Sequence, residues 1–161
     1  MKDNILLVGL HYEFTGQVAK DLSNKFDMFF LDVNQLIEYS LIDAKNIQLI
    51  CGKDYFENQK KQVILSVKQY ETTIINFPYS VYLEEDMAKE MSEKAFVIYL
   101  KLTKTQIKKL NKENGEFNIE ELAFEEISKL LEKKSDLSIK CVDLLAENAV
   151  NNIIEAMKQK L

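Results

Sequence analysis

The amino-acid sequence predicts an α/β fold, namely a three-layer α/β/α sandwich around a parallel sheet of about five strands. Short apolar runs alternate with helix-like segments along all 161 residues. Several runs, such as Ile5–Gly9, are almost continuously apolar, which is typical of strands buried on both faces. Strands that alternate with helices imply right-handed crossovers. Because neither a repeat nor a linker interrupts the pattern, we expect a single domain over residues 1–161.

The five predicted strands are short segments rich in β-branched, aliphatic and aromatic residues. They are Ile5–Gly9, Met28–Asp32, Thr72–Asn76, Ala95–Leu100 and Ser138–Val142. Helices are predicted where apolar residues recur three or four positions apart. These segments are about Thr15–Lys25, Val33–Leu41, Tyr55–Tyr70, Thr103–Leu110, Ile119–Lys134 and a C-terminal helix through Val150, Ile153, Ile154 and Met157.

Two local signals refine the helix boundaries in the second half of the chain. Thr103 and Gln106 have the spacing of a capping box, in which each side chain bonds the backbone N–H of the other residue. The segment Asn111–Asn118, NKENGEFN, combines a glycine with polar and charged residues. We therefore predict that this segment is flexible and separates two helices.

Composition excludes several classes of partner and indicates the compartment. The net charge of -5 argues against binding to nucleic acid or to an anionic membrane surface, since both require a positive field. No apolar run approaches the roughly 20 residues that span a bilayer, so we expect a cytoplasmic protein. Cys51 and Cys141 both have apolar neighbours in the sequence, which predicts buried, reduced thiols rather than a disulfide or a metal site.

All 21 basic residues are lysines, and the chain contains no arginine. AT-rich coding explains such a bias without any functional cause. The bias still limits the chemistry, because only arginine offers a planar fork that grips a carboxylate or phosphate with two parallel hydrogen bonds. Any phosphoryl-transfer site in this chain must therefore work without arginine.

The segment Ile5–Leu22, ILLVGLHYEFTGQVAKDL, has the order strand, loop and helix of nucleotide-binding loops of the GxxxxGK[ST] type. When the two are aligned on Gly9, the second glycine is replaced by Phe14, the lysine by Thr15 and the hydroxyl residue by Gly16. The frame of a phosphate-binding loop is present without its phosphate ligands. The positions of this candidate nucleotide loop are Gly9, Leu10, His11, Tyr12, Glu13, Phe14, Thr15 and Gly16.

Three further motifs give the whole chain a resemblance to the shikimate kinase family of small P-loop kinases. FLDVNQLIEY is similar to the family's FxDxDxxIE segment, and GKDYFENQ is similar to its G-E-E-x-F-R element. TIINFPYSV and FVIYLKLT are weaker matches to the segments around the family's third and fourth strands. The resemblance implies a P-loop kinase fold and, for an active member, ATP-dependent phosphoryl transfer with Mg²⁺.

The resemblance also assigns roles to residues near the phosphate loop, and most of these roles are lost. Asp32 matches the aspartate that the family associates with Mg²⁺. The second aspartate, which binds the substrate hydroxyl, is replaced by Asn34, and an amide cannot accept a proton. Within the loop, Glu13 would repel a phosphate by roughly 4 kcal/mol for unit charges 4 Å apart at an effective dielectric near 20.

Substrate-side positions are altered as well. Glu57 follows Phe56 where the family has an arginine, so an acidic substrate would be repelled. A glycine-rich turn is replaced by Asn76, Phe77, Pro78 and Tyr79. The arginine-proline lid motif is missing, which suggests a reduced lid near residues 111–125. Lys133 or Lys134 is the nearest counterpart of a late substrate-binding arginine.

Structural explanations compete with functional ones at several of these residues. Asp32 follows a strand and precedes a helix, so it can be a simple N-cap. We expect His11, the only histidine, to be a partly exposed loop residue. The aromatic residues of the two loops either plug the vacated pocket or line an apolar one, and we favour the plug because aromatic side chains gain from burial. They are Tyr12, Phe14, Phe77 and Tyr79.

Three hypotheses for function remain open. The favoured one is a non-catalytic member of the family that serves as a binding or regulatory module for a protein partner or a small ligand. The second is an active small-molecule kinase that uses ATP, Mg²⁺, Asp32 and a lysine such as Lys20, Lys53 or Lys134. The third is a structural or protein-interaction module in which the four aromatic residues form an exposed apolar patch.

Overall fold

The computed structural model describes residues 2–41, 43–84, 86–114 and 121–160. Within these ranges, five parallel strands form one sheet in the order β2-β3-β1-β4-β5. The predicted fold class is therefore confirmed. The strands are β1 (Asn4–Gly9), β2 (Phe29–Asp32), β3 (Thr73–Asn76), β4 (Ala95–Lys101) and β5 (Leu137–Lys140).

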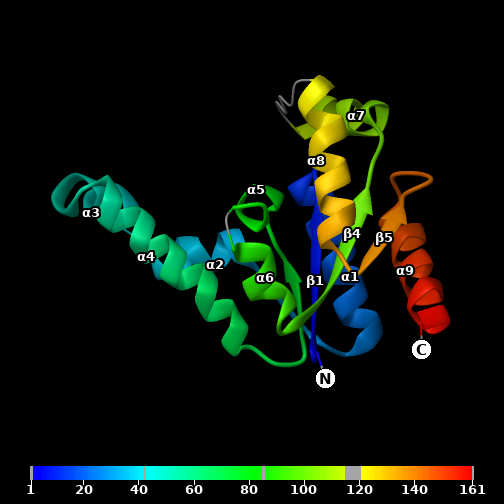
Figure 1. Ribbon diagram of the computed structural model, residues 1–161, viewed down its shortest axis with the longest axis horizontal. Coiled ribbons are helices and arrows are strands. Elements are labelled where there is room, and N and C mark those ends of the chain that lie inside the picture. The colour runs from blue at the N-terminus through cyan, green and yellow to red at the C-terminus, as the bar shows by residue number, and fades with distance from the viewer. Residues whose placement is uncertain (1, 42, 85, 115–120, 161) are drawn as a thin grey trace.

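Helices cover both faces of the sheet (Figure 1). The first face carries α1 and α9, which contact each other. The second carries α5, α6 and α8. The crossovers from β3 to β4 and from β4 to β5 run along the sheet in the direction opposite to the step from β1 to β2, so right-handed connections place their helices opposite α1. The bounds of these helices and of α7 are α1 (Tyr12–Phe26), α5 (Tyr79–Tyr82), α6 (Met87–Ser92), α7 (Lys104–Asn114), α8 (Glu121–Lys134) and α9 (Ala146–Lys160).

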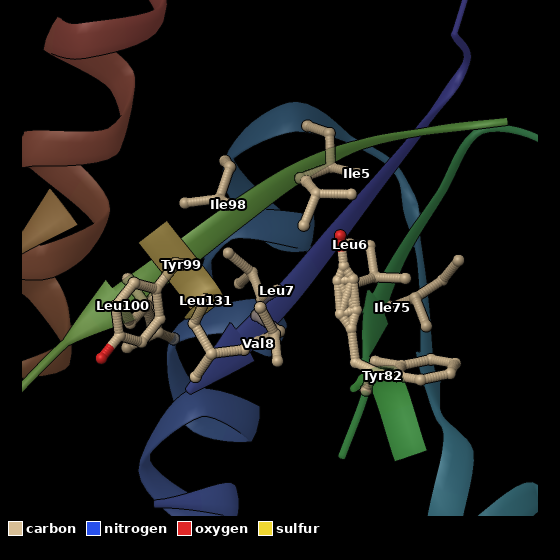
Figure 2. Packing of buried hydrophobic residues seen from close by; sticks show 14 of the residues in the cluster. Ile5, Leu6, Leu7, Val8, Ile75, Tyr82, Ile98, Tyr99, Leu100 and Leu131 are labelled. Carbon is tan, nitrogen blue, oxygen red and sulfur yellow. The ribbon is translucent and has the colours of Figure 1, made fainter. Parts of the chain in front are cut away.

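The core lies on both sides of β1, the central strand, whose six residues are all buried. Figure 2 shows side chains of β1, β3 and β4 packed together with Tyr82 of α5 and Leu131 of α8. Tyr82 is 1% exposed, and its hydroxyl donates a hydrogen bond to the Lys134 carbonyl oxygen at 2.6 Å. This bond ties α5 to the end of α8 and fixes the helix layer of the second face.

A helical arm projects from the β2 side of the sheet (Figure 1). It consists of α2 (Val33–Ser40), α3 (Ala44–Cys51) and α4 (Lys53–Leu65), and the short 3₁₀ helix η1 (Ser66–Gln69) leads from α4 back toward β3. The sequence analysis did not predict α3. Leu49, Ile50 and Cys51 are exposed there, so the expected burial of Cys51 was wrong. Cys141, in contrast, is buried as predicted.

Two boundary predictions were also wrong. The first helix begins at Tyr12 rather than near Thr15, because the side chain of His11 caps it. Residues Asn111–Asn114, expected to be flexible, belong to α7. The rest of that segment lies outside the described residues, as do residues 115–120 of the proposed lid at 111–125. The capping box at Thr103 is confirmed: Thr103 N–H donates to Gln106 Oε1 at 2.8 Å, and Gln106 N–H donates to Thr103 Oγ1 at 3.1 Å.

Among the described helices, none has the length and apolar character needed to cross a lipid bilayer. The same part of the chain contains no group of three or more histidine, cysteine, aspartate or glutamate residues placed to hold a metal ion.

Candidate functional site

Asp32 and Asn76 meet at the carboxyl edge of the sheet, where open α/β sheets bind their ligands. They end β2 and β3 and are partners in the register between these two strands. Asn76 Nδ2 donates to Asp32 Oδ2 at 3.1 Å and lies 3.3 Å from the Tyr12 carbonyl oxygen. Both acceptors are oxygens, so the Asn76 amide must present its nitrogen to them. Asp32 and Asn76, predicted separately as site residues, therefore form one cluster.

Tyr12, the first residue of α1, closes this cluster from above the strand ends. Its hydroxyl donates to Asp32 Oδ1 at 2.8 Å and accepts from the Asn34 N–H at 3.2 Å. The same oxygen lies 3.2 Å from the Asn76 carbonyl oxygen. Burial raises the pKa of Tyr12, with a smaller contribution from the hydrogen bond to Asp32. The phenol therefore stays protonated and acts as a donor to the carboxylate.

Asp32 also caps α2, as the sequence analysis considered possible. Its Oδ1 accepts from the Gln35 N–H at 3.0 Å as well as from Tyr12. Together with Asn76 Nδ2, three donors bind this one carboxylate. Asn34, whose side chain is exposed, contributes its backbone N–H to the cluster. Most of the acceptor capacity of Asp32 is consequently used inside the protein.

The loop between β1 and α1 consists of Leu10 and His11 alone. His11 is 7% exposed, so the expectation of a partly exposed loop residue was wrong. Its Nδ1 accepts from the Phe14 N–H at 3.1 Å, which is the N-cap bond of α1. Burial lowers the pKa of His11, and the nearby Glu13 partly opposes this shift. A neutral imidazole is required, because a protonated Nδ1 cannot accept the bond.

Thr15, at the lysine position of the phosphate loop, points back into the protein. It is 1% exposed, and its hydroxyl donates to the His11 carbonyl oxygen at 2.7 Å. A Cβ placed on Gly9 would lie 2.5 Å from Thr15 Oγ1 and 3.3 Å from the Leu100 carbonyl oxygen. The hydroxyl of Thr15 thus occupies space beside Gly9, and only glycine fits at that strand end.

Gly16, at the hydroxyl position of the phosphate loop, packs against Asn76. A Cβ on Gly16 would lie 2.6 Å from Asn76 Nδ2 and 3.8 Å from Asp32 Oδ2. Asn76 is fully buried, and its Oδ1 is a buried side-chain atom without a partner among the described residues. A serine or threonine at position 16 would displace this amide from Asp32. Glycine at position 16, in place of the hydroxyl residue of a phosphate loop, therefore leaves the space that the Asn76 amide occupies.

The four aromatic residues of the two loops do not form an exposed patch. Phe14 and Phe77 are 4% and 0% exposed, and Tyr12 is half-buried against Asp32. The Phe77 ring meets the ring of Tyr82 edge to face, with centroids 6.1 Å apart. Tyr79 is half-buried, and burial raises its pKa. This burial contradicts the exposed apolar patch of the third hypothesis, because its two phenylalanines belong to the core.

The remaining substrate-side residues lie apart from this cluster. Glu57 is exposed and lines a groove of about 550 Å³ between α4 and the α5–α6 segment, with Lys60, Val81 and Glu84 among the other lining residues. Lys134 is exposed and takes part in the structure through its carbonyl oxygen, which accepts from Tyr82. Pro78 precedes α5 as its N-cap residue. In the described part of the chain, no hydrogen bond links Glu57 or Lys134 to Asp32 or Asn76.

A smaller cavity of about 380 Å³ lies on the outer side of the first turn of α1. His11, Glu13 and Phe14 line it from α1 and its cap, Lys109 and Leu110 line it from α7, and Leu144 lines it from the segment before α9. Glu13 gives this cavity a carboxylate beside the first turn of the helix, where a phosphate loop would carry no acidic group.

Sequence reasoning missed Tyr12 as the residue that joins the site. The motif alignment placed it in the candidate nucleotide loop, whereas it is the first residue of a helix and reaches two neighbouring strand ends. The available signal was that Asp32 and Asn76 both end predicted strands. When those two strands are adjacent, the Tyr12 hydroxyl has two acceptors within reach, the Asp32 carboxylate and the Asn76 carbonyl oxygen.

Comparisons with known proteins agree with the geometry of the fold. The family model for shikimate kinase matches residues 16–159. The chain is similar to the crystal structure of shikimate kinase from Aquifex aeolicus, with a TM-score of 0.76, 19% sequence identity and coverage of 98% of this chain and 97% of that one.

Two other solved structures show the same similarity. Shikimate kinase from Bacteroides thetaiotaomicron has a TM-score of 0.73 at 17% identity, with 96% of this chain and 98% of that chain covered. Shikimate kinase from Acinetobacter baumannii, solved in complex with shikimate, has a TM-score of 0.75 at 16% identity, with 99% and 95% covered. No curated protein matches the sequence. The family match over nearly the whole chain, on this sheet topology, establishes that the chain belongs to the shikimate kinase family.

Proposed function

We propose that this chain is a non-catalytic member of the shikimate kinase family that serves as a binding or regulatory module. The observation that carries the proposal is the Tyr12 hydroxyl, bonded to Asp32 at 2.8 Å directly above the ends of β2 and β3. Asp32 is the one family residue at this edge that keeps its chemistry. Because Tyr12, Asn76 and Gln35 all donate to its carboxylate, it serves as a structural anion within the fold.

The phosphate loop gives independent support. A cradle for phosphate needs several backbone N–H groups pointing at one space, a lysine and a hydroxyl. In this chain the Phe14 N–H is bonded to His11, the Thr15 hydroxyl is turned toward the His11 carbonyl oxygen, and position 16 has no hydroxyl. The residues present therefore do not fit a magnesium-bound ATP molecule at this edge.

The alternative of an active kinase needs a lysine near the strand ends. Lys20, Lys53 and Lys134 are the lysines considered for this role, and all three are exposed. Lys20 lies within α1, and Lys53 begins α4 on the projecting arm. No hydrogen bond or ion pair in the described part of the chain links any of them to Asp32. The geometry thus favours a module over an enzyme.

Thermal unfolding in the presence of ATP tests the proposal at the level of binding. A ligand at a hundred times its Kd stabilises the native state by about 2.7 kcal/mol, which shifts the midpoint by several degrees. We expect that any shift produced by millimolar MgATP is the same in the wild type and in Asp32→Asn. A MgATP shift present in the wild type and lost in Asp32→Asn would place nucleotide at this edge and overturn the proposal.

A further inference from the structure

A second hollow lies at the carboxyl edge on the β4–β5 side of the sheet, at the far side of β1 from Asp32. Lys101 and Lys140 end β4 and β5 and are partners in the register of these strands. The first turn of α7 and the middle of α8 complete the walls, and Figure 1 shows α7 beyond this end of β4 and α8 running alongside the strand. The hollow has a volume of about 500 Å³, which is within the range of about 300–1,000 Å³ for small-molecule sites.

The charge of this lysine hollow is opposite to that of the chain. Its charged lining residues are Lys101, Lys104, Lys129 and Lys140 against Glu125 and Glu132. Four positive and two negative charges leave a net charge of +2 in the hollow, whereas the whole chain carries -5. Four different elements, namely β4, α7, α8 and β5, each contribute one of these lysines. A lysine-rich composition alone does not gather them at one edge.

Two of the lysines are held in place by neighbouring groups. Lys101 Nζ lies 2.6 Å from Glu132 Oε1, so the negative charge of Glu132 offsets the positive charge of Lys101. Lys104 Nζ lies 5.5 Å from the centre of the Phe124 ring, in the geometry of a cation–π contact. Phe124 is 8% exposed, so its ring is a fixed surface for the ammonium group. Lys104, Lys129 and Lys140 then face a single opposing carboxylate, that of Glu125.

We propose that the lysine hollow binds a small phosphorylated metabolite. Lysine binds phosphate as a point charge without a planar fork, which suits a chain that lacks arginine. The site also lies outside the carboxyl ends of parallel strands, where ligands of α/β sheets bind. Its residues differ from those of the phosphate loop and of the Asp32 cluster, so the inference goes beyond the proposed function and gives the module a ligand class.

Pyrophosphate is the probe for the test, and isothermal titration calorimetry on the whole chain measures its affinity. We expect binding that weakens with ionic strength, because the contacts are partly exposed charges. Lys104→Gln and Lys140→Gln should each weaken binding about fivefold, the effect of about 1 kcal/mol for unit charges 4 Å apart in water. Glu125→Gln should strengthen it by a similar factor, since it removes a repulsive charge.

Lys108→Gln is the matched control. Lys108 is an exposed residue of α7, the helix that also carries Lys104, and its replacement changes the net charge by the same amount as Lys104→Gln. It should leave the affinity within twofold. Lys109 lines the cavity beside His11, so Lys109→Gln tests whether pyrophosphate binds in that cavity instead. Absence of pyrophosphate binding at millimolar concentration would overturn the inference, and so would equal losses in Lys108→Gln and Lys140→Gln, or a larger loss in Lys109→Gln. None of these outcomes depends on whether Asp32 supports catalysis.

Discussion

Asn76 Nδ2 and Asp32 Oδ2 lie 3.1 Å apart across two neighbouring strand ends, and this contact organises the carboxyl edge of the sheet. Tyr12 adds its hydroxyl on the other carboxylate oxygen. Gly16 provides the space that the Asn76 amide needs. The edge where the family's phosphate chemistry is expected is thus occupied by a hydrogen-bonded cluster that belongs to the fold, and its energetics can be measured.

Replacing Tyr12 by phenylalanine removes the donor to Asp32 and leaves the Asn34 N–H without its acceptor. Hydrogen bonds to charged groups contribute about 1.5–3 kcal/mol. We therefore expect Tyr12→Phe to lower the free energy of unfolding in urea by about 1–3 kcal/mol. Tyr39→Phe is the control, because Tyr39 is 77% exposed. Removing its hydroxyl should change the free energy of unfolding by less than about 0.5 kcal/mol. Equal effects of the two substitutions would show that the Tyr12 hydroxyl contributes nothing.

Gly16→Ala should destabilise the protein even though alanine favours a helix by about 1 kcal/mol. The added Cβ would lie 2.6 Å from Asn76 Nδ2, and such overpacking costs about 1–3 kcal/mol. In the Asn76→Ala background the obstacle is gone, so the same Gly16→Ala change should be stabilising. Urea unfolding of the four proteins in this double-mutant cycle measures the reversal. An effect of Gly16→Ala with the same sign in both backgrounds would refute the steric link.

The N-cap at His11 should make stability depend on pH. Its pKa is lowered from the ordinary value of 6.5 in the folded protein, so the unfolded chain binds a proton first as pH falls. The contribution of the cap is therefore complete above about pH 6.5 and is lost as pH decreases from there toward the folded-state pKa.

His11→Asn is the matched variant for this measurement, because asparagine is a good N-cap whose side chain does not titrate. The free energy of unfolding of the wild type minus that of His11→Asn should fall as pH decreases from about 7.5 to 5.5. Since His11 is the only histidine, other groups largely cancel in this difference. A difference that stays constant or rises over this range would contradict the assigned cap.

The two cysteines should differ strongly in reactivity. Cys51 is exposed at the end of α3, whereas burial raises the pKa of the Cys141 thiol to about 11. Because the thiolate is the reactive form, a disulfide reagent should titrate one thiol in the native protein and a second one after unfolding. Cys51→Ser should abolish the native reaction. Rapid reaction of Cys141 in the native Cys51→Ser protein would contradict the buried position.

The central strands β1, β3 and β4 could be predicted because they are mostly apolar segments buried on both faces, a pattern that depends on local sequence. The start of α1 could not, since histidine is not among the usual N-cap residues and its role depends on the side-chain contact to Phe14. Cys51 was misjudged for a related reason. Its apolar neighbours Leu49 and Ile50 are themselves more than four-fifths exposed on the projecting arm.

Candidate site residues were predicted individually, but their arrangement was not. The resemblance to the family's motifs identified Asp32, Asn34 and Asn76 as site positions. The bond from Tyr12 to Asp32 joins residues that are 20 positions apart, and it depends on the rotation of α1 above the sheet. Such a contact has no periodic signature. The same limit applies to the lysine hollow, whose four lysines come from four separate elements.

We propose that the Asp32 cluster serves the fold and supports no phosphoryl transfer. ADP release from MgATP with shikimate as acceptor, measured on the wild type and on Asp32→Asn at equal protein concentrations, tests this role. We predict that both proteins give the rate of the protein-free blank. A wild-type rate above the blank that is lost in Asp32→Asn would refute this structural role, because the carboxylate would then act on substrate or metal.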